Sequence, residues 1–267
     1  MKRIVLIIIA ISLAVTSLAG LSNEMYKVFR QGKPLIIDQD RAIINGRLET
    51  GRTAELTTVY LTEDLLRRSV QATVRVTASG PSGRSSFSSG SGVNIDPNGL
   101  IITGAHVVQN SDMQNAENIT ITFFTGRKYA ARIKEISSEK DLAVLELLKQ
   151  NNTLPAIELG DSLGVMEGDK ITVIGFPLGD FSVMSGTVTR LNVRSARLSI
   201  PLIQINANTN KGNSGGPVLN ESGKVIGIVV GTFDPADESQ RNFLGAVVPI
   251  NEVKPYLVER WDARGER

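Results

Sequence analysis

Cysteine is absent from this chain of 267 residues, and histidine occurs only once. Without cysteine the chain can form no disulfide, so its folded state depends on burial alone. One histidine and no cysteine also argue against a zinc site, because such sites are built mainly from these two residue types. The sequence contains no P-loop and no G-x-G-x-x-G pattern that opens a helix. We therefore expect no metal and no cofactor.

An excess of charge is also lacking. The formal net charge is +2 at pH 7, and two basic residues at the N-terminus, Lys2 and Arg3, account for it. Without these two of its 29 basic residues, the chain has as many basic residues as its 27 acidic ones. This balance gives no reason to expect nucleic acid or an anionic surface as a partner.

One apolar run, over residues 4–19, stands out at the N-terminus. As a helix it would be about 24 Å long, which is shorter than the roughly 30 Å hydrocarbon core of a membrane. Ser17 and Ala19 are the small residues that a signal-peptidase site requires. We expect residues 1–19 to be a cleaved signal peptide and the protein to be exported, periplasmic or secreted. The alternative is an uncleaved segment that anchors the protein, and only then would a membrane be a partner.

Residues 20–60 have a mixed composition and a weak pattern. A flexible linker is disfavoured, because it would leave Ile36, Ile37, Ile43 and Ile44 exposed. We expect an N-terminal extension that packs against the body of the protein or against a neighbouring subunit.

Short strand-like runs separated by turns fill most of the sequence after residue 70. Residues 96–99, D-P-N-G, have proline and glycine where a hairpin turn needs them. The Ser/Gly-rich stretch 79–92 is expected to be a mobile loop, with residues 90–92 (G-S-G) as a turn. This pattern predicts an all-β barrel or sandwich. The strands are expected at 72–76, 119–124, 129–133, 142–147, 170–176, 183–193, 202–206, 225–230 and 243–248.

Two short helices complete the expected structure. The first begins at Thr62, and Leu65, Leu66 and Val70 are spaced to form its buried face. The second is expected over residues 252–259, near the C-terminus.

Ser214 lies in the glycine-rich stretch G-N-S-G-G-P between two apolar runs. Taken alone, this stretch is most simply a tight turn between strands. A serine hydroxyl becomes a nucleophile when a base takes its proton, and the single histidine, His106, follows the apolar run 100–102. Asp141, which opens the run D-L-A-V-L, can orient that histidine. Each residue alone has an ordinary structural explanation, but the order His, Asp, Ser predicts a catalytic triad.

The glycines around Ser214 also suggest a site for the negative charge that develops during acyl transfer. The amides of Gly212 and Ser214 can converge on one point, with Asn213 between them. We expect these three residues to form an oxyanion hole.

Three motifs match one protein family: T-G-A-H-V-V around His106, D-L-A-V-L at Asp141 and G-N-S-G-G-P-V around Ser214. On these motifs the chain resembles a trypsin-like serine protease of the bacterial HtrA (Deg) type, from about residue 61 to 258. The resemblance implies a chymotrypsin-like, all-β fold of two six-stranded antiparallel β-barrels. A short N-terminal helix and a C-terminal helix would accompany the barrels.

The resemblance also implies a division of the chain. The signal peptide and the extension precede a protease domain, and a short tail follows it. His106 and Asp141 would then lie in the first barrel and Ser214 in the second, with the substrate in the groove between them. The expected bounds are 1–19, 20–60, 61–258 and 259–267, with the barrels at about 70–152 and 155–250.

The sequence departs from the HtrA pattern close to the nucleophile. Asn208 is expected on the floor of the S1 pocket, with Thr232 and Phe233 along its wall. A neutral floor favours a small or medium apolar residue at P1 over Lys or Arg. Lys211 replaces a proline common in the family, which leaves open whether the oxyanion loop is preformed. The chain ends soon after Pro249, so the PDZ domain typical of HtrA proteins is not expected.

The expected function is that of a serine endopeptidase that hydrolyses protein or peptide substrates, in envelope protein quality control or regulated processing. A homo-oligomer such as the trimer common in the family is compatible with the sequence. Two alternatives stay open: a catalytically silent protease-fold protein that binds unfolded or extended polypeptides, and an interaction protein in which the triad is coincidental.

Overall fold

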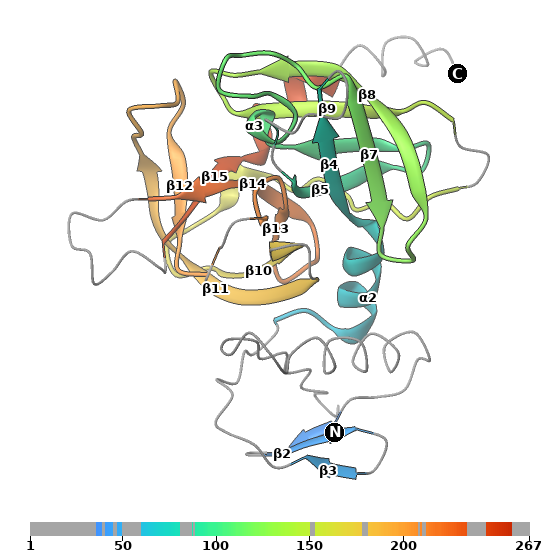
Figure 1. Cartoon of the computed structure of the whole chain (residues 1–267). Coiled ribbons are helices and arrows are strands. Elements are labelled where there is room, and N and C mark those ends of the chain that lie inside the picture. The colour runs from blue at the N-terminus through green and yellow to red at the C-terminus, as the bar shows by residue number, and fades with distance from the viewer. Residues whose placement is uncertain are drawn as a thin grey trace, which may run out of the picture.

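Two closed β-barrels dominate the computed structural model (Figure 1). Each barrel has six antiparallel strands, so the predicted all-β, two-barrel fold class is confirmed. The structure describes residues 36–38, 41–44, 47–49, 60–80, 87, 89–149, 153–177, 181–207, 209, 212–233 and 244–257.

The first barrel closes in the strand order β4-β5-β6-β9-β8-β7. Alternation of buried and exposed positions explains how its strands curl around a core, as β7 shows with Ile119, Ile121 and Phe123 buried on one face. The strands are β4 (Thr73–Ser79), β5 (Ser89–Asp96), β6 (Leu100–Thr103), β7 (Asn118–Phe123), β8 (Lys128–Ser137) and β9 (Leu142–Leu147).

The second barrel closes in the order β10-β11-β12-β15-β14-β13. Its longest strand, β11, pairs with both β10 and β12 and carries register shifts that bend it around the barrel. The strands are β10 (Lys170–Gly175), β11 (Ser182–Val193), β12 (Leu202–Ile205), β13 (Pro217–Leu219), β14 (Val225–Thr232) and β15 (Gly245–Pro249).

The predicted N-terminal helix is α2 (Glu63–Ala72). The Thr62 hydroxyl accepts a hydrogen bond from Leu65 N (3.4 Å) and caps the first turn. Leu66 and Val70 are buried, as their spacing predicted, and they join the apolar cluster between the barrels.

The stretch expected as a mobile loop is in part a strand, because Ser89–Asp96 forms β5. The prediction of a turn at residues 90–92 was therefore wrong. A Cβ on Gly90 would lie 2.7 Å from Val107 Cγ2, and one on Gly92 would lie 2.9 Å from Ile101 Cγ2. These glycines permit close packing against neighbouring segments, a use that composition alone does not distinguish from a turn.

The C-terminal helix differs from the expected one. Its described residues form two 3₁₀ turns, η5 (Ile250–Glu252) and η6 (Lys254–Leu257). The bonds Val253 N to Ile250 O and Tyr256 N to Val253 O span three residues instead of four. Pro255 has no N–H to donate, which helps to explain why an α-helix does not form here.

A small antiparallel sheet lies within the predicted N-terminal extension. It consists of β1 (Ile36–Asp38), β2 (Arg41–Ile44) and β3 (Arg47–Glu49), paired in that order. The signal peptide predicted over residues 1–19 lies outside the described residues.

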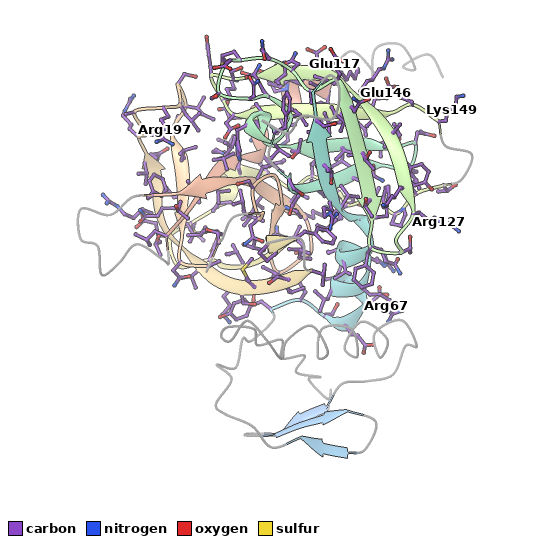
Figure 2. The ribbon with its side chains drawn as sticks, viewed as in Figure 1. Arg67, Glu117, Arg127, Glu146, Lys149 and Arg197 are labelled. Carbon is purple, nitrogen blue, oxygen red and sulfur yellow. The ribbon has the colours of Figure 1, made fainter. Side chains whose placement is uncertain are left out.

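The charged side chains that Figure 2 labels, among them Arg67, Glu117 and Arg127, lie on the outside of the molecule. No charged residue is fully buried among those that the structure describes. Within the same residues, no helix is long and apolar enough to cross a membrane.

Candidate active site

His106 lies on a one-turn helix, α3 (Ala105–Val108), directly after the buried strand β6. Val107 and Val108 are fully buried and fix this turn in the first barrel, whereas the His106 side chain is 39% exposed. Gly104 precedes the helix, and a Cβ there would lie 3.1 Å from His106 Cε1. The local sequence thus presents the imidazole at the surface of a rigid core.

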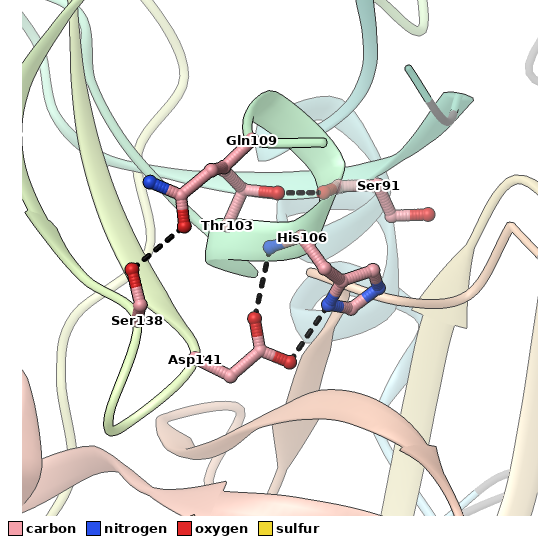
Figure 3. A network of polar contacts seen from close by, with 6 residues as sticks. All are labelled: Ser91, Thr103, His106, Gln109, Ser138 and Asp141. Carbon is pink, nitrogen blue, oxygen red and sulfur yellow. Dashed lines mark hydrogen bonds and ion pairs between the residues drawn. The ribbon is translucent and has the colours of Figure 1, made fainter. Parts of the chain in front are cut away.

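Asp141 holds His106 through both of its carboxylate oxygens (Figure 3). Oδ2 is 2.7 Å from His106 Nδ1, and Oδ1 accepts the backbone N–H of His106 at 2.9 Å. With Nδ1–H donating to the carboxylate, Nε2 is the nitrogen that can take a proton. The structure therefore brings together two of the three predicted catalytic residues in the geometry of a base and its orienting acid.

Ser214 lies on a turn of the second barrel, just before β13, and is half-buried. Gly215 N donates to Val229 O (2.6 Å), and Gly216 N donates to Asn213 O (2.8 Å). Because the second bond fixes the peptide between Asn213 and Ser214, it also fixes the direction of the Ser214 N–H. We call residues 212–216 the nucleophile turn.

The nucleophile turn meets the first barrel next to His106. Ser91 N donates to Ser214 O (2.8 Å), and a Cβ on Gly90 would lie 2.8 Å from that oxygen and 2.7 Å from Val107 Cγ2. The Ser214 carbonyl and the side chain of Val107, the residue after His106, thus both pack close to Gly90. The third predicted catalytic residue is therefore placed close to the other two.

Ser214 and His106 both belong to the described part of the chain, and their side chains form no hydrogen bond with each other there. In substrate-free enzymes this bond is often long or poorly aligned, and it tightens when substrate binds. The described geometry thus provides an oriented base and a fixed turn.

The remaining predicted site residues differ in their surroundings. Asn213 is fully buried, and its Nδ2 lies 3.8 Å from Met184 Sδ. Phe233 packs on the apolar cluster between the barrels and Thr232 is exposed, while Asn208, with Lys211, lies outside the described residues.

A cavity of about 610 Å³ opens beside the His106–Asp141 pair. Residues from the segment after His106 line one side, and Arg197 and Leu198 of the second barrel line another. The lining residues are Ala105, His106, Gln109, Asn110, Ser111, Met113, Ser138, Asp141, Arg197 and Leu198.

No group of three or more His, Asp or Glu side chains is placed to hold a metal ion in the described ranges. Among the contacts of the nucleophile turn, those with Ser91 were not predicted from the sequence. Its position between two glycines was the available signal, but it could not be distinguished from a turn.

Comparison with known proteins gives a consistent picture. The family model for the trypsin-like peptidase domain matches residues 90–228. The chain is 34% identical over 183 residues to the probable periplasmic serine endoprotease DegP-like of Rickettsia prowazekii, which covers 66% of this chain and 34% of that protein. It is 34% identical over 168 residues to the serine protease Do-like HtrB of Bacillus subtilis, which covers 59% of this chain and 34% of that protein.

A plant relative and a solved structure extend this similarity. The chain is 33% identical over 171 residues to the chloroplastic protease Do-like 1 of Arabidopsis thaliana, covering 62% of this chain and 37% of that protein. The structure of the HtrA-type protease AlgW with a tripeptide matches with a TM-score of 0.64 and 25% identity, over 78% of this chain and 65% of that chain. The matched part of the chain corresponds to about a third of the length of these three relatives.

Proposed function

The chain belongs to the family of trypsin-like peptidases, and we propose that it is an HtrA-type serine endopeptidase that uses His106, Asp141 and Ser214 as its catalytic triad. The observation that carries the proposal is the pair of contacts between Asp141 and His106, 2.7 Å from Oδ2 to Nδ1 and 2.9 Å from Oδ1 to the backbone nitrogen. Two such hydrogen bonds fix both the position and the tautomer of a catalytic base.

The reaction is acyl transfer to water. His106 Nε2 takes the proton of the Ser214 hydroxyl as Ser214 Oγ attacks the peptide carbonyl, and the amides of Gly212 and Ser214 stabilise the oxyanion. His106 then gives the proton to the leaving amine, which departs and leaves an ester on Ser214. Water repeats the attack with the same base, releasing the acid and restoring Ser214.

The cavity beside His106 and Asp141 supports a polypeptide as the substrate, since it opens next to the proposed base and is lined by residues of both barrels. Asn208, Thr232 and Phe233 stay proposed as the residues around P1. Export is supported by the name of the periplasmic relative. Removal of residues 1–19 stays a proposal, and N-terminal sequencing of the exported protein tests it. Trimer formation and a role in envelope quality control also stay proposals.

Replacing Ser214 by alanine is expected to lower kcat by about 10⁶-fold, because the nucleophile is lost while the backbone of the turn is kept. The measurement is cleavage of an unfolded protein by the purified chain. Ser222→Ala, the same change at an exposed serine on another turn, is the control and keeps full activity. Cleavage by Ser214→Ala at the wild-type rate would exclude the assignment.

Labelling with a fluorophosphonate separates this function from that of a silent polypeptide-binding protein. The probe reacts only with an activated serine, and peptide mapping is expected to find it on Ser214. A folded chain that binds unfolded polypeptide but takes up no probe would support the silent alternative.

A further inference from the structure

Ser91, on β5 of the first barrel, is fully buried and contacts the nucleophile turn of the second barrel. Its N–H donates to Ser214 O (2.8 Å), and its hydroxyl donates to Gly212 O (2.6 Å). The same hydroxyl accepts from Phe176 N (2.9 Å), and the carbonyl of Ser91 accepts from Thr103 Oγ1 (2.7 Å; Figure 3). Every polar atom of Ser91 therefore forms a hydrogen bond, and three of these four hydrogen bonds join the first barrel to the second.

Glycines of the second barrel make room for this residue. A Cβ on Gly215 would lie 2.1 Å from Ser91 O, and one on Gly175 would lie 2.9 Å from Ser91 Oγ. A Cβ on Gly216 would lie 3.3 Å from Ser91 Cβ. A larger side chain at position 91 would therefore meet backbone, and a smaller one would leave Gly212 O and Phe176 N without this partner.

We propose that Ser91 is a positioning residue for the reaction: its hydroxyl holds the Gly212 carbonyl, which fixes the peptide between Gly212 and Asn213. This bond anchors the nucleophile turn in the position from which the Gly212 and Ser214 amides reach the oxyanion. This inference rests on the proposed triad. Gly212 has a φ of +100° and no side chain to restrain its rotation. The bond from Ser91 Oγ supplies the restraint from the opposite barrel.

The alternative is that Ser91 only stabilises the fold by satisfying buried backbone groups. The two roles differ in what they change. A residue that positions the oxyanion donors affects kcat, whereas a bond that only stabilises the folded state affects the folded fraction and leaves the folded enzyme active.

The test compares Ser91→Ala with Thr73→Val. Thr73 is also fully buried, and its hydroxyl donates to Ser69 O (2.8 Å) at the end of α2, so its loss removes a hydroxyl–carbonyl bond elsewhere in the first barrel. Ser91→Ala is expected to lower kcat for a peptide substrate by about 10- to 100-fold with KM unchanged, since losing an oxyanion donor outright costs about 10²- to 10³-fold. Thr73→Val is expected to lower stability and to leave kcat unchanged.

A peptide aldehyde gives a second readout, because its adduct with serine is tetrahedral and needs the same amides. Its affinity is expected to fall in Ser91→Ala by the same factor as kcat. Ser91→Cys keeps a weak donor of similar shape, so its kcat and its affinity for the aldehyde are expected to lie between those of the wild type and Ser91→Ala.

Three results would overturn the inference: kcat of folded Ser91→Ala within twofold of the wild type, equal losses of kcat in Ser91→Ala and Thr73→Val, or failure of both Ser91 variants to fold. The last would assign Ser91 to folding. If the wild type is not labelled by the fluorophosphonate at Ser214, the proposed triad itself is wrong. If the wild type is labelled and kcat of Ser91→Ala is unchanged, only the role of Ser91 is wrong.

Discussion

Three residues of the site have left-handed backbone angles: Asp141 (φ +52°), Gly212 (φ +100°) and Gly215 (φ +86°). For a residue with a Cβ this conformation costs about 1–2 kcal/mol, and Asp is among the side chains that adopt it most readily. At Asp141 the cost is offset by the two hydrogen bonds that its carboxylate forms with His106. The two glycines avoid the cost and let the turn approach β5.

Gly215→Ala is expected to abolish activity and to lower the free energy of unfolding by more than about 3 kcal/mol, because strain and a backbone clash add. Its Cβ would lie 2.1 Å from Ser91 O and 2.2 Å from Thr103 Oγ1. Gly126→Ala is the matched control, with a φ of +81° and no atom within 4 Å of the added Cβ. This control is expected to lower the free energy of unfolding by only about 1 kcal/mol. Urea unfolding measures the stability of both variants. Equal losses of stability would contradict the steric clash at Gly215.

The segment between β8 and β9, residues 138–141, is the element that presents Asp141. Ser138 Oγ donates to Gln109 Oε1 (2.6 Å; Figure 3), which ties the segment to the chain after α3. Glu139 O accepts both the N–H (2.9 Å) and the hydroxyl (3.1 Å) of Ser199 in the second barrel. The segment that orients the base is thus fixed from both barrels.

Lys140 links the same segment to the C-terminal turns. Its Nζ is 2.8 Å from Glu252 Oε2 and 5.6 Å from the centre of the Tyr256 ring. The hydrogen bond to Glu252 raises the pKa of Lys140 above its ordinary value of 10.5. A raised pKa in the folded state means that the stabilisation is fully present below pH 10.5 and is lost as the pH rises through the folded-state value.

Lys140→Met is therefore expected to lower the free energy of unfolding by about 1 kcal/mol at neutral pH. The difference from the wild type should shrink as the pH rises above 10.5. Lys149→Met, at an exposed lysine, is the control and changes stability by less than about 0.5 kcal/mol. Urea titrations at several pH values measure the effect, and a deficit that stays constant in alkali would refute the ion pair as its source.

At the scale of the whole molecule, one apolar cluster joins the two barrels. It contains Ile102 and Leu142 of the first barrel and Ile174 and Leu219 of the second, all 2% exposed or less. Leu66 of α2 belongs to the same cluster. Since this surface would be exposed to water if either barrel unfolded alone, the barrels support each other.

The protein is therefore expected to unfold in a single thermal transition. Calorimetry should give equal calorimetric and van't Hoff enthalpies, the criterion for two-state unfolding. Leu66→Ala, which removes part of the shared cluster, should lower the midpoint without splitting the transition, at a cost of about 2–5 kcal/mol. Two separate transitions in the wild type would show that the barrels are independent.

The local pattern predicted some of the elements closely. Leu142–Leu147 was predicted to the residue, and α2 begins directly after Thr62, where a helix was expected to start, because period and capping depend on near neighbours. The three-residue strand β13 (Pro217–Leu219) is too short for a period to be recognised. The resemblance to HtrA-type proteases is confirmed by the family model and the relatives, and it is carried by the same motifs that mark the proposed triad.

By itself the sequence determined that the chain forms many short strands without disulfides, and it predicted which histidine, acid and serine act together from their type and order. Only the tertiary structure decided what Ser91 touches, that Lys140 meets Glu252, and that the C-terminal residues form 3₁₀ turns. The reason is physical. Hydrogen bonds such as that between Ser91 and Gly212 join residues 121 positions apart, and nothing in the local sequence records which distant backbone group a buried hydroxyl will meet.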